Sequence, residues 1–260
     1  MELLLILTFC FGAIVGSFLN VVILRLPEEG SSIVLPASHC PQCKSPLHWY
    51  DNIPLLSYLL LRGRCRTCHK QISLQYPLVE MSMGLLSLGL MARFGPSLAF
   101  GGYFVFCAAL LVIIWIDIYH QIIPDSISLP GIVLGFLFAL ISPTLTWQDS
   151  LIGLLAGGGL LYLIAWSYFL LRHQEGMGGG DIKLLAMLGA FLGWQALPFV
   201  ILASSLSGSI IGLTAMLISG SSMQTRIPFG PFLAVAAMGY LFYSKQIQHL
   251  FTLYLSGTLF

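Results

Sequence analysis

Long apolar stretches divide most of the chain into segments of the length that a membrane helix needs. About 20 apolar residues cross the hydrocarbon core of a bilayer, and fewer suffice where a helix is buried or has snorkelling ends. Eight stretches meet this requirement, which predicts an all-α polytopic membrane protein with about eight transmembrane helices. They are residues 3–24, 77–94, 97–116, 127–142, 150–171, 181–194, 196–219 and 229–243.

Three details qualify this pattern. The first stretch follows Met1 and Glu2 and lacks the basic leader of a secretory signal, so we expect it to remain as a membrane span. The stretch 181–194 is the least regular, because glycines interrupt it at two positions. Residues 246–258, after the last span, could lie on the membrane surface.

The composition agrees with a membrane protein. Of the 260 residues, 57% are hydrophobic and 8% are charged, and the mean hydropathy is +0.91. A soluble domain carries charge on about a quarter of its residues, so lipid is the expected main solvent and partner. The formal net charge of +1 excludes a general attraction to nucleic acid.

The position of the basic residues predicts the orientation of the spans. Loops on the cytoplasmic side of a membrane are enriched in Lys and Arg. If residues 25–76 lie inside and the spans alternate, nine basic residues fall inside and two outside, with both termini outside. The inside residues are Arg25, Lys44, Arg62, Arg64, Arg66, Lys70, Arg172, Lys183 and Arg226, and the outside residues are Arg93 and Lys245.

A small soluble insertion lies between the first two spans. Its roughly 50 residues are too few for an adequate hydrophobic core, so a cross-link is expected. Two Cys-x-x-Cys turns supply it, Cys40-Pro-Gln-Cys43 and Cys65-Arg-Thr-Cys68. Four thiolates can hold one tetrahedral Zn²⁺, and a site filled by four protein ligands is structural rather than hydrolytic.

Other interpretations of these cysteines stay open. Two structural disulfides or a redox function would also use paired cysteines, although a reducing cytoplasm disfavours both. His39 and His69 adjoin the two turns and could replace a cysteine as ligand.

Three aspartates at span boundaries are the candidates for catalysis. Acidic groups beside membrane spans are energetically expensive, which makes each a functional hypothesis. The predicted topology places Asp117 and Asp181 at the same cytoplasmic depth on different helices. Two adjacent carboxyls can share one proton, so that one acts as a base and the other as an acid in peptide hydrolysis. Asp125 follows Pro124 at the start of a span, which favours a helix N-cap role.

Further candidates surround Asp181. The run Gly176-Met-Gly-Gly-Gly180 permits positive φ and leaves room for an extended substrate, so Gly178 and Gly180 are candidate substrate contacts. A flexible linker is the alternative. Lys183 could anchor the helix at the interface or tune the charge of Asp181.

These motifs resemble those of a known family, the type IV prepilin peptidases, over nearly the whole chain. The resemblance is carried by Gly16-Ser-Phe-Leu-Asn20-Val-Val, Arg25-Leu-Pro27, both cysteine pairs, Asp51-Asn-Ile-Pro-Leu-Leu-Ser-Tyr58, Arg62-Gly-Arg-Cys65, Tyr76-Pro-Leu-Val-Glu80, Ile116-Asp117 eight residues before Asp125, Gly178-x-Gly180-Asp181-x-Lys183 and Ile227-Pro-Phe-Gly-Pro-Phe232. Presenilin-like proteases share the Gly-x-Gly-Asp signature, but the cysteine pairs and the amino-terminal motif are particular to prepilin peptidases.

The resemblance implies a bifunctional enzyme of the bacterial cytoplasmic (inner) membrane whose active site faces the cytoplasm. Such enzymes remove the basic leader of prepilins or pseudopilins and methylate the new N-terminus with S-adenosylmethionine. It implies Asp117 and Asp181 as the catalytic pair, with Asp125 a weaker third candidate. The expected domains are residues 1–24, the first transmembrane helix; 25–76, a zinc-binding insertion associated with methyl transfer; and 77–260, a membrane aspartyl protease.

The methyl-donor site has no sequence motif of its own. The insertion lacks a Gly-x-Gly-x-x-Gly turn and is too short for a dinucleotide-binding domain. Family analogy places the site near the insertion, where Asn20, Arg25 and Glu80 are plausible contributors. Each has a structural alternative: Asn20 could bridge helices, Arg25 could anchor its span, and Glu80 could pair with Arg62 or Arg64.

A transporter or channel with a regulatory zinc module is the rival interpretation. The three aspartates would then line an ion path. An ion path would require an acidic residue near the middle of a span, and the predicted spans carry theirs only near one face.

Overall fold

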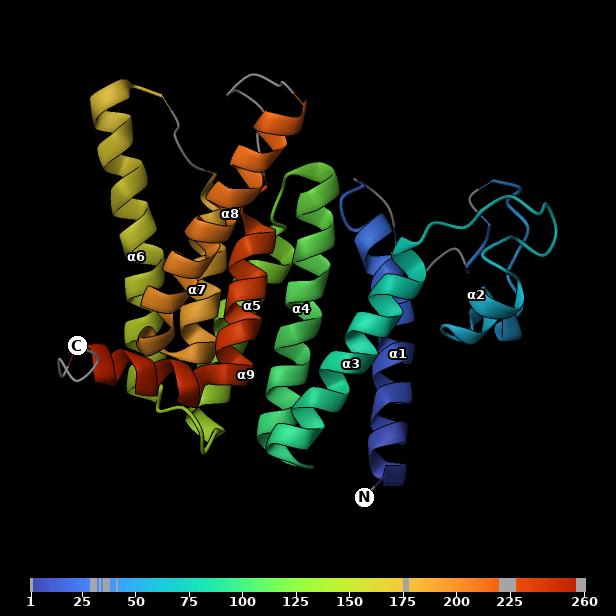
Figure 1. Cartoon of the computed structure of the whole chain (residues 1–260), viewed down its shortest axis with the longest axis horizontal. Coiled ribbons are helices and arrows are strands. Elements are labelled where there is room, and N and C mark those ends of the chain that lie inside the picture. Colours follow the sequence, from blue (N-terminus) through green and yellow to red (C-terminus); the bar gives the residue numbers. More distant parts are fainter. Residues whose placement is uncertain are drawn as a thin grey trace. The chain divides into compact units, whose positions relative to one another are not determined.

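The computed structural model of the protein describes residues 2–28, 32, 34, 38–40, 42–174, 178–219 and 228–255. The regular elements of these residues are helices (Figure 1). They are α1 (Glu2–Arg25), α2 (Leu56–Leu60), α3 (Gln75–Phe94), α4 (Leu98–His120), α5 (Asp125–Ile141), α6 (Trp147–Arg172), α7 (Gly179–Leu192), α8 (Leu197–Ser219) and α9 (Gly230–Leu255), with short 3₁₀ turns at Trp49–Asn52 and Trp194–Ala196. The chain forms two compact units, residues 1–112 and 113–260, and the boundary falls within α4.

Each of the eight predicted apolar stretches coincides with a helix, which confirms the all-α class. Among the described residues, four helical segments are long and apolar enough to cross a membrane: Glu2–Arg25, Leu98–His120, Trp147–Arg172 and Trp194–Ile218. The count of eight spans stays a prediction. The last helix runs past the predicted end at residue 243, because α9 kinks at Tyr243 (φ −118°, ψ 19°) and then continues to Leu255.

In the first unit, α1 and α3 pack closely through small residues. A Cβ added at Gly12 would lie 2.6 Å from the Cβ of Ser87, so only glycine allows this approach. Ser87 Oγ donates to the Thr8 carbonyl at 3.0 Å, a buried bond between the helices. Small residues and hydroxyl bonds of this kind hold helices together where lipid removes the hydrophobic driving force.

The two cysteine turns of the insertion have the same backbone geometry. In the first turn Cys40 N donates to Ser45 O and Lys44 N to Cys40 O, both at 2.9 Å. In the second, Cys65 N donates to Lys70 O at 2.9 Å and His69 N to Cys65 O at 3.0 Å. The residue after the second cysteine has positive φ in both turns, 59° at Lys44 and 56° at His69. The repeated geometry turns the thiols of each pair to the same side.

In the second unit, α7 is the buried centre. Every residue from Leu184 to Leu192 is buried, as expected for a short helix that is apolar on all sides. Gly153 of α6 and Gly189 of α7 lie in backbone contact, and Ser150 Oγ donates to the Ala190 carbonyl at 2.7 Å. Gly189 is therefore a packing residue, and the helix ends at Gly193 (φ 79°).

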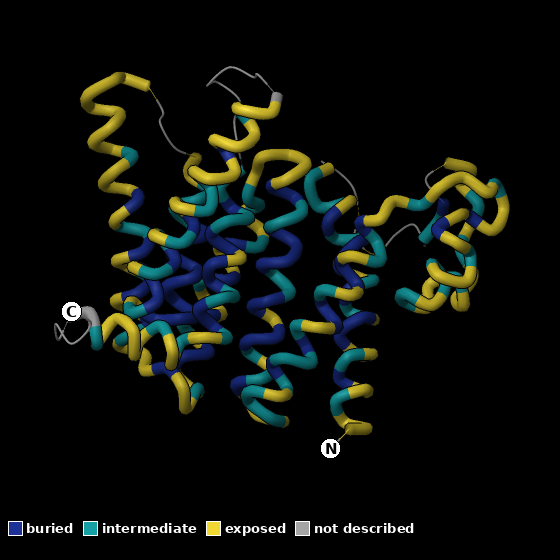
Figure 2. Tube along the Cα trace, in the orientation of Figure 1, coloured by how far each residue is buried: buried dark blue, intermediate teal, exposed yellow. Residues whose placement is uncertain are grey.

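The outer helices expose large apolar side chains. Figure 2 shows the C-terminal half of α6 as exposed, and Tyr162, Trp166 and Leu171 are 60%, 51% and 81% exposed. A soluble protein rarely presents such a continuous apolar face. Contact with lipid explains it, and the chain is a multi-pass membrane protein.

Candidate functional site

Asp117 is a buried acid near the C-terminal end of α4. Its side chain is only 4% exposed. Its Oδ2 accepts a 2.9 Å hydrogen bond from the backbone N–H of Gly230, the first residue of α9. The first N–H groups of a helix have no partner within that helix, so Asp117 satisfies one of them and is held in place by it.

Asp181 lies in the first turn of α7 and interacts electrostatically with Asp117. Ile123 packs on Gly180, which precedes Asp181, and on Gly230, whose N–H bonds to Asp117. A Cβ added at Gly180 would lie 2.9 Å from Ile123 Cβ, and one added at Gly230 would lie 3.3 Å from Ile123 Cδ1. The structure thus brings together the two carboxyl groups that the sequence singled out, although they are separated by more than 60 residues of chain. Their catalytic role stays a prediction.

Gly230 leaves no room for a side chain next to Asp117. A Cβ at this position would lie 2.6 Å from Asp117 Oδ2, inside van der Waals contact. We expect Gly230→Ala to displace the carboxyl and to lower peptide cleavage by about 10²-fold, because small misplacements of catalytic groups have effects of that size. Cleavage by the purified variant measures this.

Gly239→Ala is the matched control for Gly230→Ala. It makes the same change in the same helix, where an added Cβ meets nothing within 4 Å. Its cleavage rate should equal that of the wild type. Equal rates for both variants would contradict a requirement for close contact at Gly230.

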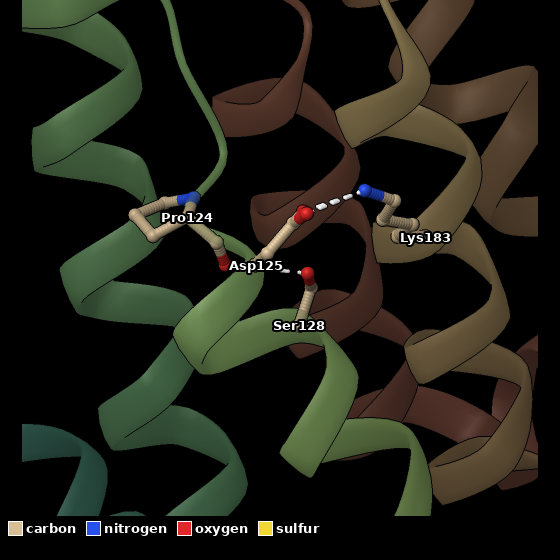
Figure 3. A network of polar contacts seen from close by, with 4 residues as sticks. All are labelled: Pro124, Asp125, Ser128 and Lys183. Carbon is tan, nitrogen blue, oxygen red and sulfur yellow. Dashed lines mark hydrogen bonds and ion pairs between the residues drawn. The ribbon is translucent and has the colours of Figure 1, made fainter.

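Asp125 and Lys183 form an ion pair at the start of α5 and α7 (Figure 3). Lys183 Nζ lies 2.7 Å from both carboxylate oxygens of Asp125. The predicted N-cap role of Asp125 is wrong by one position. The cap is Pro124, Asp125 is the first helical residue, and Ser128 Oγ donates to the Pro124 carbonyl at 3.2 Å. The carboxylate of Asp125 turns to Lys183 instead of capping its own helix.

This ion pair should contribute little stability. The side chains of Lys183 and Asp125 are 36% and 56% exposed, and exposed pairs contribute less than about 1 kcal/mol. We expect Asp125→Asn and Lys183→Gln each to lower the free energy of unfolding by no more than this, as measured by thermal melting in detergent. A larger loss of unfolding free energy that high salt does not reduce would contradict the assignment of a weak, exposed ion pair.

The glycine run before Asp181 is only partly described. Gly176 and Met177 lie outside the described residues. Gly178 is the N-cap of α7, with φ −67°, and none of the described glycines of the run adopts the positive φ that glycine permits. A Cβ at Gly178 would meet nothing within 4 Å, whereas Gly180 packs on Ile123, and the role of both glycines as substrate contacts stays a prediction.

The four cysteines of the insertion form one cluster. Their sulfurs lie within 4.8 Å of one another, and the sulfurs of Cys40 and Cys68 are 3.9 Å apart. A tetrahedral zinc site with Zn–S distances of about 2.3 Å separates its sulfurs by about 3.8 Å. Hydrogen bonds from the Ser45 side chain and backbone lower the pKa of Cys43 to about 6, which favours the thiolate that binds metal. The residues therefore fit a zinc ion.

In the described part of the chain, neither disulfides nor histidine ligands are found at this cluster. All four cysteines are free thiols, so no disulfide joins them. Among the described residues the cluster includes neither His39 nor His69. Arg66 of the second turn forms an ion pair with Asp51 at 2.8 Å and lies over the Tyr50 ring.

Three polar residues proposed near the methyl-donor site also have defined positions in the first unit. Asn20 Nδ2 donates to the Tyr76 carbonyl at 3.2 Å and so bridges α1 and α3 as expected. Arg25 donates to the Ser32 carbonyl at 3.1 Å. Glu80 does not pair with Arg62 or Arg64 but accepts a 2.8 Å bond from Leu55 N.

Sequence reasoning missed some residues of both sites. Gly230 and Ile123 shape the surroundings of Asp117, and only the motif from Ile227 to Phe232 pointed to the first. Gln75, which adjoins Tyr76, is 95% buried and was not considered. No local pattern marks it.

These features define a class: an all-helical membrane protein with a paired-carboxyl site and a four-cysteine cluster. Comparison with known proteins makes this more specific. Residues 10–94 match the bacterial peptidase A24 N-terminal domain, and residues 104–213 match the type IV leader peptidase family. The chain belongs to the type IV leader peptidase family.

Named relatives agree over nearly the full length. The prepilin leader peptidase/N-methyltransferase of Aeromonas hydrophila is 40% identical over 93% of this chain and 91% of the relative. Proteins with the same name from Burkholderia pseudomallei and Pseudomonas aeruginosa are 40% and 38% identical, over 89% and 92% of this chain and 83% and 90% of the relatives. No solved structure matches the chain. The transporter alternative is not favoured.

Proposed function

We propose that this chain cleaves the basic leader from type IV prepilins or pseudopilins and methylates the new N-terminus. Family membership and the names of the relatives support both activities. The observation that carries the peptidase assignment is the position of Asp117 and Asp181 in the second unit, where Ile123 packs on Gly180 beside Asp181 and on Gly230 bonded to Asp117.

The two carboxyls can divide the chemistry between them. The charge of one opposes ionisation of the other, so the pair holds one proton more readily than none. The ionised member takes a proton from a water molecule, which attacks the scissile carbonyl carbon. The protonated member then donates its proton to the leaving amine, so neither metal nor covalent intermediate is required.

The surroundings of the pair suit such a substrate. The open space at Gly178 admits an extended backbone beside Asp181, and Ile123 offers an apolar contact. The two acidic groups favour a cationic leader. Asp125 and Lys183 are assigned a supporting role, since their ion pair joins the starts of α5 and α7.

We assign two further groups to the first unit. Cys40, Cys43, Cys65 and Cys68 would hold a structural Zn²⁺ that cross-links the insertion. The N-methyltransferase activity requires S-adenosylmethionine, which supplies the methyl group. We place the protein in the bacterial inner membrane with eight spans and with its active site facing the cytoplasm, which the distribution of Lys and Arg supports.

One assay tests the proposed function. The purified protein is incubated with a prepilin and isotope-labelled S-adenosylmethionine, and mass spectrometry reads the cut and the label on the same product. We expect cleavage and one added methyl group at the new N-terminus. A product that is cut but unlabelled would contradict the methyltransferase assignment. An intact prepilin would contradict both assigned activities.

A further inference from the structure

A group of buried polar side chains lies between α1 and α3, at the ends nearest the insertion. Asn20, Gln75 and Glu80 are 1%, 5% and 6% exposed. The bond from Asn20 to the Tyr76 carbonyl places Asn20 beside the first turn of α3, which contains Gln75. Glu80 lies one turn further along α3, where a Cβ added at Gly16 would approach its Cα to 2.8 Å. The three residues therefore share one helix contact.

Two polar atoms of this group have no partner among the described residues. They are Asn20 Oδ1, an acceptor, and Gln75 Nε2, a donor. The orientation of the Asn20 amide is defined, because its nitrogen faces the Gly16 and Tyr76 carbonyls at 3.3 and 3.2 Å and carbonyls only accept. Buried polar groups are nearly always hydrogen-bonded, so an unpaired acceptor and an unpaired donor in one helix contact call for a bound group.

Glu80 adds an acidic group to the same helix contact. Its Oε2 accepts a bond from Leu55 N, and Ser17 lies within hydrogen-bonding reach of the carboxyl. No lysine, arginine or histidine of the described chain forms an ion pair with it. The donors that face this buried carboxyl are neutral, and a cationic donor would complement the charge of its ionised form.

The chemistry of the three groups selects a ligand. A carboxylate beside an amide oxygen holds an ammonium group, and an amide N–H beside them holds a carbonyl or carboxylate oxygen. The first turn of α3 adds helix N–H groups that favour the same oxygen. We propose that Asn20, Gln75 and Glu80 bind an α-amino-acyl group, with its amine at Glu80 and Asn20 and its carbonyl oxygen at Gln75.

This inference rests on the proposed N-methylation, which involves two such groups. One is the amino-acid end of S-adenosylmethionine, and the other is the free N-terminal residue of the cleaved pilin. Leu55 of the insertion contacts the site through its N–H bond to Glu80, and its φ of 62° is unfavourable for a leucine.

The decisive variant is Gln75→Leu. The substitution removes a buried donor without a partner, so a purely structural amide predicts an unchanged or higher melting temperature and no effect on binding. A binding amide predicts weaker binding by about tenfold or more, which is the size of one lost hydrogen bond to a charged group. Exposed Gln71→Leu, four residues earlier, is the matched control and should change neither property.

The experiment uses the full-length protein in detergent with two probes measured in parallel by calorimetry. One probe is S-adenosylhomocysteine, which carries the same amino-acid end as the methyl donor. The other is a synthetic peptide with the N-terminus of a cleaved pilin. Weaker binding of the first probe places the donor at the site, and weaker binding of the second places the acceptor amine there.

The outcomes separate this inference from the proposed function. We expect Gln75→Leu and Glu80→Gln to lose binding of one probe and methylation while retaining cleavage. Wild-type affinity of both variants for both probes overturns the inference and leaves a buried water at the site, although the enzyme still cuts and methylates. If the wild-type protein binds a probe but neither cuts nor methylates a prepilin, the proposed function is contradicted instead. If Glu80→Gln fails to fold, Gln75→Leu alone decides.

Discussion

Asp117→Asn and Asp181→Asn should each lower prepilin cleavage by about 10² to 10⁴-fold, the range that a general acid or base contributes. Asparagine keeps the size of the side chain and still accepts the Gly230 N–H bond through its carbonyl oxygen. It cannot take a proton from water or share one with a second carboxyl. Both proteins should therefore fold and insert but not cut, which mass spectrometry of a prepilin substrate measures.

Asp149→Asn provides the control for both substitutions. Asp149 lies in the second unit, where its Oδ1 accepts bonds from Trp194 Nε1 at 2.9 Å and Gln195 Nε2 at 3.1 Å. Asparagine can accept both through its own oxygen, so this variant should fold and cut like the wild type. Normal processing by Asp117→Asn or by Asp181→Asn would remove that residue from the mechanism.

The helices of this protein could be predicted because lipid leaves the sequence few alternatives. An apolar stretch of sufficient length must be helical in a bilayer, since every backbone group needs a partner within the segment. This reasoning found α7 within two residues at each end, as residues 181–194 against Gly179–Leu192. It misjudged the interruption at Gly189, because the contact with Gly153 depends on a partner helix that no local pattern identifies.

Part of the candidate site could likewise be predicted from the sequence, and part depends on contacts between distant segments. An acidic residue at the end of an apolar stretch can be recognised from the sequence alone, because the free-energy penalty of placing it near lipid depends on the adjacent residues. This criterion identified Asp117 and Asp181. The Gly230 donor is separated from Asp117 by 113 positions, so only the folded chain reveals that bond. Asp125 was assigned to capping because sequence shows its neighbour Pro124 but not Lys183, 58 positions away.

Removing one thiolate of the cysteine cluster should release zinc. Cys43→Ser and Cys68→Ser each leave three strong ligands, and a structural zinc site contributes free energy directly to folding. We expect metal analysis to fall from about one zinc per wild-type chain to near none. Limited proteolysis should then cut the insertion between the two turns, because its short helices and turns have no sufficient core of their own.

The two activities should respond differently to this loss of zinc. Asp117 and Asp181 belong to the second unit, whereas the cysteine turns, Leu55 and Glu80 belong to the first. Leu55 lies on the chain between the two turns and bonds to Glu80, so a loosened insertion disturbs that contact directly. Methylation should therefore fall further than cleavage when both are measured on the same product.

Cys10→Ser tests whether these effects are specific to the cluster. Cys10 lies in the same unit as an exposed thiol of α1, outside the group of four sulfurs. Its replacement should preserve zinc, resistance to proteolysis and both activities. A wild-type protein that lacks zinc but performs both reactions would refute the structural role of the metal, and a Cys43→Ser protein that retains a full zinc equivalent would refute the ligand set.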